Sequence, residues 1–336
     1  MAKIAILGAG GFGISLGVLF EQSKHNVSIW SHTPATVQML LTEHEHKKLL
    51  PGIKISPDIN ITGDISCVKD TDIVIIATPS TAVRSTCQTI AALLSERTVV
   101  ACVSKGLEQG TYKDIYHVME EELANPLVIL SGPSHAEEVG RGEATTVVAA
   151  SENKDAAQFI QKTLMNKSFR IYTNDDVIGV ELGGALKNII ALAAGIGDGL
   201  GLGDNAKAAL MTRGIAEISR LGVALGGRAE TFGGLSGIGD LIVTCTSMHS
   251  RNRRTGILIG QGMNGTDAVK EIGMTVEGVG STKVAYELSQ QVGIDMPIVT
   301  QVYKVLFENK NAAEAVNELM ARPGKNESEA AWLHLT

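Results

Sequence analysis

The stretch Lys3-Ile-Ala-Ile-Leu-Gly-Ala-Gly-Gly-Phe-Gly13 decides the fold of this chain. Residues 3–7 are an apolar run of strand length, a glycine-rich turn follows directly, and a helical pattern continues through Phe20. A second strand pattern lies at residues 26–30. Strand, glycine turn, helix and strand within about thirty residues are the context that a G-x-G-x-x-G dinucleotide fingerprint requires. The sequence therefore predicts a nucleotide-binding βαβ unit at its start.

The three spaced glycines of this turn have different expected roles. Gly8 allows a tight turn, Gly10 lets the backbone approach a pyrophosphate, and Gly13 permits close packing of the helix against the strand. The N-terminus of the helix adds N–H donors for the phosphates. A plain glycine turn is the alternative, because a single G-x-G-x-x-G is weak evidence. Its position directly after a strand favours the dinucleotide site.

The rest of the chain divides into two parts. Apolar runs of strand length, separated in several places by helical patterns, continue at residues 73–77, 98–103, 127–131, 145–150 and 169–172. After about residue 175 such runs largely stop and helical patterns dominate. We therefore predict an α/β N-terminal domain with a doubly wound (Rossmann-type), mainly parallel sheet over residues 1–177. An all-α C-terminal domain is predicted over residues 178–336.

Composition argues against several classes of protein. A net charge of −7 over 336 residues does not suit a protein that coats nucleic acid. The four cysteines form no C-x-x-C pair and fit no zinc spacing, so we expect no metal site. The N-terminus lacks the features of a signal peptide, and we expect a cytoplasmic protein. We expect the polar tail at residues 322–329 to be mobile or surface-bound.

One long apolar run raises the question of a membrane span. It extends from Leu182 to Gly203 but contains Lys187, Asp198 and seven glycines. Charged residues and this many glycines argue against stable membrane insertion.

Lys187 is the one lysine within this apolar run, in the segment Glu181-Leu-Gly-Gly-Ala-Leu-Lys-Asn188. An ammonium group that loses water there is costly unless it is paired or used. Desolvation also lowers the pKa of a lysine, which suits proton transfer near neutral pH. The alternative is a lysine that reaches the surface along its aliphatic stem.

The end of the second predicted strand indicates cofactor preference. An NAD-selective site usually has an acidic residue there for the ribose hydroxyls. This chain has Ser31-His32-Thr33 instead, and no acidic residue before Glu43. An NADP 2′-phosphate would meet no repelling carboxylate, and His32 could stack on adenine or donate to that phosphate. A surface-loop histidine is the alternative for His32.

Four later segments suggest a substrate site. Lys105 follows one predicted strand, and Gly132 and Ser134 follow another, at the edge where open parallel sheets bind ligands. Either segment could instead be only a turn. Asp240 ends a glycine-rich turn, where it could orient a lysine or only cap the next helix. His135, beside Ser134, is a weaker acid/base candidate than Lys187.

The fourth segment is Ser250-Arg-Asn-Arg-Arg-Thr255. Ser250 is expected to cap a helix that has Arg251 and Asn252 in its first turn. Cations are unfavourable at a helix N-terminus unless an anion sits between them, so the three arginines predict a bound anion. An ordinary solvated basic patch is the alternative. With this net charge we favour a small phosphorylated ligand.

Taken together, these motifs resemble those of bacterial NAD(P)-dependent glycerol-3-phosphate dehydrogenases over nearly the whole chain. The order and combination carry the resemblance: G-A-G-G-F-G at 8–13, S-K-G at 104–106, S-G-P-S at 131–134, E-L-G-G-A-L-K-N at 181–188, G-L-S-G-I-G-D-L at 234–241, S-R-N at 250–252 and G-M-T-V-E-G at 273–278. The resemblance implies reduction of dihydroxyacetone phosphate with NADP or NAD as cofactor, in a cleft between the two domains. We also expect a homodimer.

The resemblance also implies the roles of individual residues. Lys187 would be the proton donor and acceptor. The substrate site would be lined by Lys105, Gly132, Ser134, Asp240, Ser250, Arg251 and Asn252. The cofactor would touch Gly11, Phe12, His32, Lys105, Ala136, Arg251 and Glu277. The chain departs from the family pattern at Gly11, where relatives often carry a serine, and at His135, where another aromatic residue is more usual.

Two other functions are consistent with parts of this pattern. A related two-domain NADP-dependent reductase could act on a non-phosphorylated 2-oxoacid such as ketopantoate. A dinucleotide-sensing regulator would share the first domain, but it should also have a DNA-binding helix pair and a basic face, which we do not find in this sequence.

Overall fold

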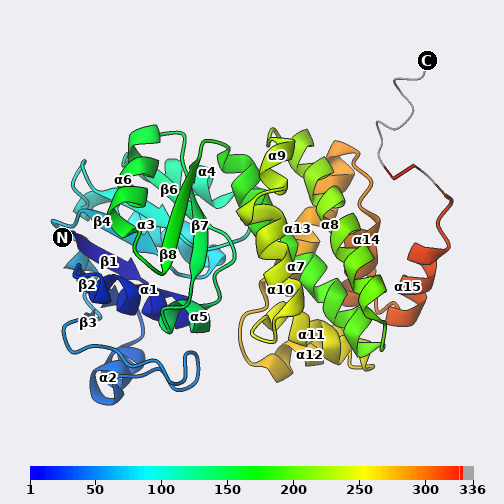
Figure 1. Ribbon diagram of the computed structural model, residues 1–336, viewed down its shortest axis with the longest axis horizontal. Helices are drawn as coiled ribbons and strands as arrows, with labels where there is room; N and C mark the ends of the chain where they lie inside the picture. Colours follow the sequence, from blue (N-terminus) through cyan, green and yellow to red (C-terminus); the bar gives the residue numbers. More distant parts are fainter. Residues whose placement is uncertain (325, 328–336) are drawn as a thin grey trace.

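The computed structural model describes residues 1–324, 326 and 327, in two lobes (Figure 1). Residues 325 and 328–336 lie outside the described residues, and they include parts of the predicted C-terminal domain and of the tail predicted to be mobile or surface-bound. The N-terminal lobe contains an eight-stranded sheet in the order β3-β2-β1-β4-β5-β6-β7-β8. Its strands are β1 (Lys3–Leu7), β2 (Asn26–Trp30), β3 (Asn60–Thr62), β4 (Ile73–Ile76), β5 (Val99–Cys102), β6 (Leu127–Ser131), β7 (Thr145–Ala150) and β8 (Phe169–Asn174).

The sheet confirms the doubly wound fold that the sequence predicts. All neighbouring strands are parallel except β6 and β7, which are antiparallel. The chain order reverses between β1 and β4, and ligands of such sheets bind at this switch point. The helices of this lobe are α1 (Gly11–Gln22), α2 (Pro34–Glu43), α3 (Val83–Ile90), α4 (Ile115–Glu120), α5 (Ala136–Gly140) and α6 (Lys154–Leu164). Short 3₁₀ turns are η1 (Ile65–Val68), η2 (Ser80–Ala82) and η3 (Ala91–Leu93).

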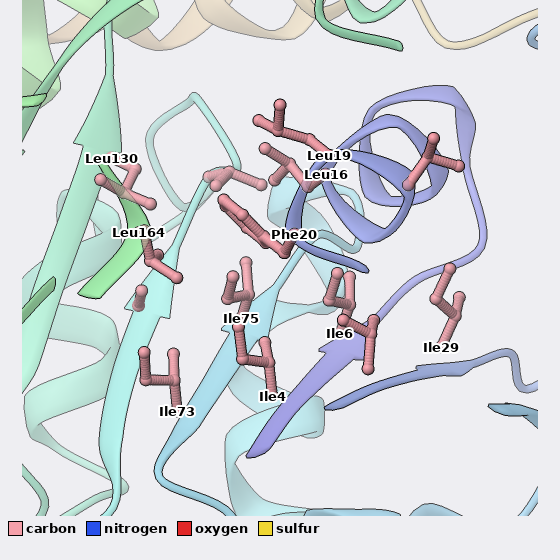
Figure 2. Close-up of a cluster of buried hydrophobic side chains, with 14 of the residues drawn as sticks. Ile4, Ile6, Leu16, Leu19, Phe20, Ile29, Ile73, Ile75, Leu130 and Leu164 are labelled. Atoms are coloured by element: carbon pink, nitrogen blue, oxygen red, sulfur yellow. The ribbon is translucent and has the colours of Figure 1, made fainter. Parts of the chain in front are cut away.

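Helix α1 lies against the sheet through a core of aliphatic side chains. Figure 2 shows Leu16, Leu19 and Phe20 of α1 over the isoleucines of β1 and β4. Burial of one such side chain contributes about 1.5–3 kcal/mol. The turn before the helix needs glycine at Gly8, which has a φ of +130°, and a Cβ there would lie 2.5 Å from the Ala77 carbonyl oxygen after β4. A Cβ at Gly13 would overlap the Gly8 carbonyl oxygen.

The second lobe is helical among the described residues, as predicted. Its elements are α7 (Val177–Gly199), α8 (Asp204–Ala224), α9 (Ala229–Phe232), η4 (Leu235–Gly239), α10 (Asp240–Thr246), α11 (Arg251–Gly260), α12 (Gly265–Ile272), α13 (Glu277–Val292), α14 (Pro297–Phe307) and α15 (Ala312–Met320). The sheet ends at Asn174 and α7 begins at Val177. The domain division between residues 177 and 178 stays a prediction.

Helix α7 is the central element of the second lobe. Among the described residues it is the one helix long and apolar enough to cross a membrane, and 89% of its apolar window is buried inside the protein. It packs closely on α11 through glycines at i and i+4: Gly195 and Gly199 on α7 face Gly256 and Gly260 on α11. A Cβ at any of these four positions would overlap backbone atoms of the other helix. The apolar run is therefore a core helix.

Candidate active site

A cleft of about 610 Å³ lies between the carboxyl edge of the sheet and helices α7, α10 and α11. It brings together residues that are more than 200 positions apart in the sequence, from the Gly8 turn to Glu277. Of the predicted site residues, those that line it are Gly8, Gly10, Gly11, Phe12, Gly13, His32, Lys105, Ser134, Ala136, Lys187, Ser250, Arg251, Asn252 and Glu277. Gly132 and Asp240 are not among the lining residues, but both contact Lys105.

Lys187 is buried in the middle of α7, with a relative exposure of 6%. Its Nζ donates hydrogen bonds to Oδ1 of Asp240 and, over 2.7 Å, to Oγ1 of Thr244. Burial lowers the pKa of Lys187 to about 8, although Asp240 opposes that shift. The surface-reaching alternative for this lysine is therefore wrong, and its ammonium group can give up a proton near neutral pH.

Asp240 lies between two lysines. Its Oδ2 is 2.6 Å from Nζ of Lys105, and that same Nζ donates to the carbonyl oxygen of Gly132 over 3.1 Å. Burial alone would raise the pKa of Asp240, but Lys105 and Lys187 hold it below its usual value. Asp240 is the first residue of α10, and its side chain contacts these two lysines rather than the backbone N–H groups of its own helix. It therefore orients both lysines, and the capping alternative for Asp240 is wrong.

The sequence reasoning missed Thr244. The Thr244 hydroxyl donates to the Asp240 carbonyl oxygen over 2.6 Å, so it is left to accept the hydrogen bond from Lys187. Residues four apart lie on one face of a helix, and this i+4 spacing after Asp240 was the available signal. Together, Asp240 and Thr244 fix the position of the Lys187 Nζ.

Beside Lys187, a chain of amides connects three helices. Asn188 donates to Oε2 of Glu277 over 3.2 Å and accepts from Nδ2 of Asn252 over 2.9 Å. The Asn252 Oδ1 in turn accepts from the backbone N–H of Gly278. This network sets the position of Asn252 and Glu277 at the cleft wall, and Asn188 is a further residue that the sequence reasoning did not assign.

The N-terminus of α11 opens onto the same cleft. Ser250 caps the helix as predicted, because its Oγ accepts from the backbone N–H of Arg253 over 3.2 Å. The prediction that all three arginines surround an anion is wrong for Arg253, which is bound to Asp198 at 2.8 Å and does not line the cleft. Arg251 and Arg254 do line it.

The glycine turn forms the other end of the cleft. No atom lies within 4 Å of a Cβ built at Gly10, so the backbone there has room for a ligand. At Gly11 a Cβ would lie 2.9 Å from the Leu49 carbonyl oxygen, so a serine here would have to displace the loop after α2. His32 is exposed at the end of β2, and the nearby lining residues Ser31, Thr33, Thr36, His46 and Leu49 include no carboxylate. This geometry fits a dinucleotide whose ribose end lies near His32.

His135 lies in the cleft wall, next to His249 at a ring distance of 5.7 Å. Burial, and then the charge of Lys187, lower its pKa. A neutral imidazole there does not compete with Lys187 as the proton donor. Among the described residues, no group of three or more His, Cys, Asp or Glu side chains could hold a metal ion.

Comparisons with known proteins identify relatives over nearly the whole length of the chain. The model of the N-terminal part of NAD-dependent glycerol-3-phosphate dehydrogenase matches residues 3–157, and the model of the C-terminal part matches residues 176–317. The glycerol-3-phosphate dehydrogenase [NAD(P)+] of Fusobacterium nucleatum is 52% identical over 331 residues, which are 97% of this chain and 99% of the relative. The enzyme of that name from Desulfitobacterium hafniense is 51% identical, over 99% of this chain and 95% of its own.

A comparison with solved structures finds the same enzyme among the relatives of this chain. The crystal structure of glycerol-3-phosphate dehydrogenase from Coxiella burnetii superposes with a TM-score of 0.91 and 37% identity, over 96% of this chain and 99% of its own. A ketopantoate reductase from Ralstonia eutropha shares 16% identity at a TM-score of 0.61, over 95% of this chain and 99% of its own, which shows the fold alone. The glycine turn, the cleft and these relatives together lead to one conclusion: the chain belongs to the NAD-dependent glycerol-3-phosphate dehydrogenase family.

Proposed function

We propose that this protein is an NAD(P)-dependent glycerol-3-phosphate dehydrogenase that reduces dihydroxyacetone phosphate to sn-glycerol 3-phosphate for glycerophospholipid synthesis. The observation that carries the proposal is the buried Lys187, held by Asp240 and Thr244 in the same cleft as the Gly8–Gly13 turn. When bound, the nicotinamide supplies the hydride. The residues that would hold the dinucleotide are Gly8, Gly10, Gly11, Phe12, Gly13, His32, Lys105, Ala136, Arg251 and Glu277.

The chain's own residues supply the proton and the orientation. As the substrate carbonyl carbon gains hydride, negative charge develops on its oxygen, and Lys187 gives this oxygen a proton. Asp240 keeps the lysine in place and its charge balanced. Arg251, Asn252 and the N-terminus of α11 hold the substrate phosphate, with Lys105, Gly132, Ser134 and Ser250 nearby, so binding energy at the phosphate orients the carbonyl.

The test of this function is oxidation of NADPH or NADH by the purified protein with candidate substrates. We expect turnover with dihydroxyacetone phosphate and none with ketopantoate. Turnover with ketopantoate alone would instead favour the 2-oxoacid reductase, the alternative function.

We also propose the domain division between residues 177 and 178, a homodimer and a cytoplasmic location. Light scattering on the purified protein measures the oligomeric state.

The pH dependence of kcat/KM should follow the protonation state of Lys187. In carbonyl reduction the lysine must be protonated, so kcat/KM should be constant at low pH and fall above a pKa of about 8. In alcohol oxidation the neutral lysine accepts the proton, so kcat/KM should rise through the same pKa. Rates in both directions across this range test the assignment. If kcat/KM fell with rising pH in both directions, or rose in both, Lys187 would not be the group that transfers the proton.

Arg251→Ala should weaken phosphate recognition selectively. A lost charge-assisted contact costs about 1.5–3 kcal/mol, so kcat/KM for dihydroxyacetone phosphate should fall roughly 10- to 150-fold. Unphosphorylated dihydroxyacetone should lose little. Arg97→Ala, at an exposed surface arginine, is the control. With the cofactor saturating, an equal loss for both substrates would show that Arg251 does not bind the substrate phosphate.

Cofactor preference should respond to charge at the end of β2. NADPH should be accepted at least as well as NADH, because no carboxylate lies beside His32 among the cleft-lining residues of this region. Ser31→Asp or His32→Asp should raise KM for NADPH and shift preference toward NADH. Steady-state rates with both cofactors at low ionic strength measure this, since salt screens exposed charge. If the ratio of the rates with NADPH and NADH did not change, the adenosine ribose would not be bound at the end of β2.

A further inference from the structure

The three arginines of α11 have different surroundings. Arg253 has its charge balanced: its Nε is 2.8 Å from Oδ2 of Asp198, and its Nη1 donates to the Thr246 carbonyl oxygen over 2.6 Å. It does not line the cleft. Arg253 therefore holds α11 against α7 and the preceding loop.

Arg254 borders the cleft and lacks such a partner. Its Nε is buried and has no hydrogen-bond acceptor in the part of the chain that the structure describes. Within the described residues, no carboxylate lies within salt-bridge distance of its guanidinium. The side chain as a whole is half-buried, so the cost falls on the buried Nε–H. A native protein that keeps a buried donor without an acceptor usually has a ligand or another compensation for it.

Arg254 follows Arg251 by three residues, so the two side chains are neighbours on one flank of α11. Both line the cleft. The other cations of the cleft, Lys105 and Lys187, already share the carboxylate of Asp240. The ligands of the proposed function bring several phosphate charges into the same space. The two guanidiniums are the groups placed to balance them.

We infer that Arg254 is a second phosphate-binding residue of the cleft and acts beside Arg251. The inference rests on the proposed function. It adds a residue to which the family resemblance gives no role, and it narrows the anion predicted among three arginines to Arg251 and Arg254. Its ligand is a phosphate oxygen, which can come from the dinucleotide or from the substrate. On binding, the guanidinium donates to that oxygen, and the buried Nε–H gains an acceptor.

The test compares Arg254→Gln, Arg254→Lys and the control Arg97→Gln by equilibrium titration. NADH and NADPH are titrated into the free protein. sn-Glycerol 3-phosphate is titrated into the protein saturated with NADH, and glycerol, which lacks the phosphate, is titrated in the same way as a control. No reaction can occur, because the alcohol and the cofactor are both in the reduced form. Arg254→Gln should bind at least one phosphate ligand roughly ten- to a hundredfold more weakly, with partial recovery in Arg254→Lys. The melting temperature of the free protein should not fall.

The titrations with NADH, NADPH and glycerol 3-phosphate distinguish the possible sources of the phosphate. Weaker NADH and NADPH binding identifies the pyrophosphate, weaker NADPH binding alone identifies the 2′-phosphate, and weaker glycerol 3-phosphate binding alone identifies the substrate phosphate. Affinities within twofold of wild type in every arm would overturn the inference. So would a clear drop in the melting temperature of free Arg254→Gln, the result that we expect for Arg253→Gln because that variant loses the ion pair with Asp198. If the wild type binds dinucleotides but not glycerol 3-phosphate, the proposed function fails while the dinucleotide arms still test Arg254.

Discussion

Lys187→Met should leave a folded protein that binds cofactor but turns over about 10²- to 10⁴-fold more slowly, which is the usual contribution of general acid catalysis. Methionine has about the same length and no charge, so it fits the buried site on α7 without an ammonium group to desolvate. The measurements are kcat with dihydroxyacetone phosphate and the dissociation constant of NADPH by fluorescence titration.

Lys283→Met is the matched control, because Lys283 is exposed on α13 and lines no part of the cleft. It should keep the wild-type rate. If Lys187→Met retained a rate within a few-fold of wild type, Lys187 would not be the proton donor, and the pH profile would need another group.

Asp240→Asn should cost both stability and activity. The substitution leaves two ammonium groups, Lys105 and Lys187, without their shared counter-ion in a buried site. Removal of one partner from a buried ion pair typically destabilises a protein by about 3–5 kcal/mol. Urea denaturation of both proteins at neutral pH measures the difference in the free energy of unfolding.

The pH dependence of this stability loss identifies its cause. Without Asp240, the pKa of Lys187 in the folded protein should fall further below the lysine value of 10.5, because the carboxylate that raises it is gone. A group whose pKa is depressed on folding destabilises the fold at low pH, and this penalty disappears as pH rises toward its unfolded value. The deficit of Asp240→Asn should therefore shrink in alkaline buffer.

A double variant provides the control. Lys187→Met in the Asp240→Asn background removes one of the stranded charges and should recover part of the lost stability, so the two changes should not be additive. Additive losses would show that Asp240 stabilises the fold independently of Lys187.

Local signals in the sequence predicted much of this protein. The βαβ start could be read from adjacent residues, because the φ of Gly8 and the packing of Gly13 are requirements of a single turn. The Ser250 cap is likewise a contact over three residues. Lys187 was conspicuous because a lysine stood alone in an apolar run, and the family resemblance joined these motifs into one reaction.

Contacts between distant segments could not be predicted from such signals. Asp240 meets Lys187 across 53 positions and Lys105 across 135, and nothing in the local spacing places one carboxylate between two lysines. The close approach of α7 and α11 through facing glycines depends on how two helices pack. Arg253 and Arg254 are adjacent in sequence, yet one pairs with Asp198 and the other borders the cleft. Helical periodicity gives the direction of a side chain around its own helix, but only tertiary packing decides which partner that direction meets.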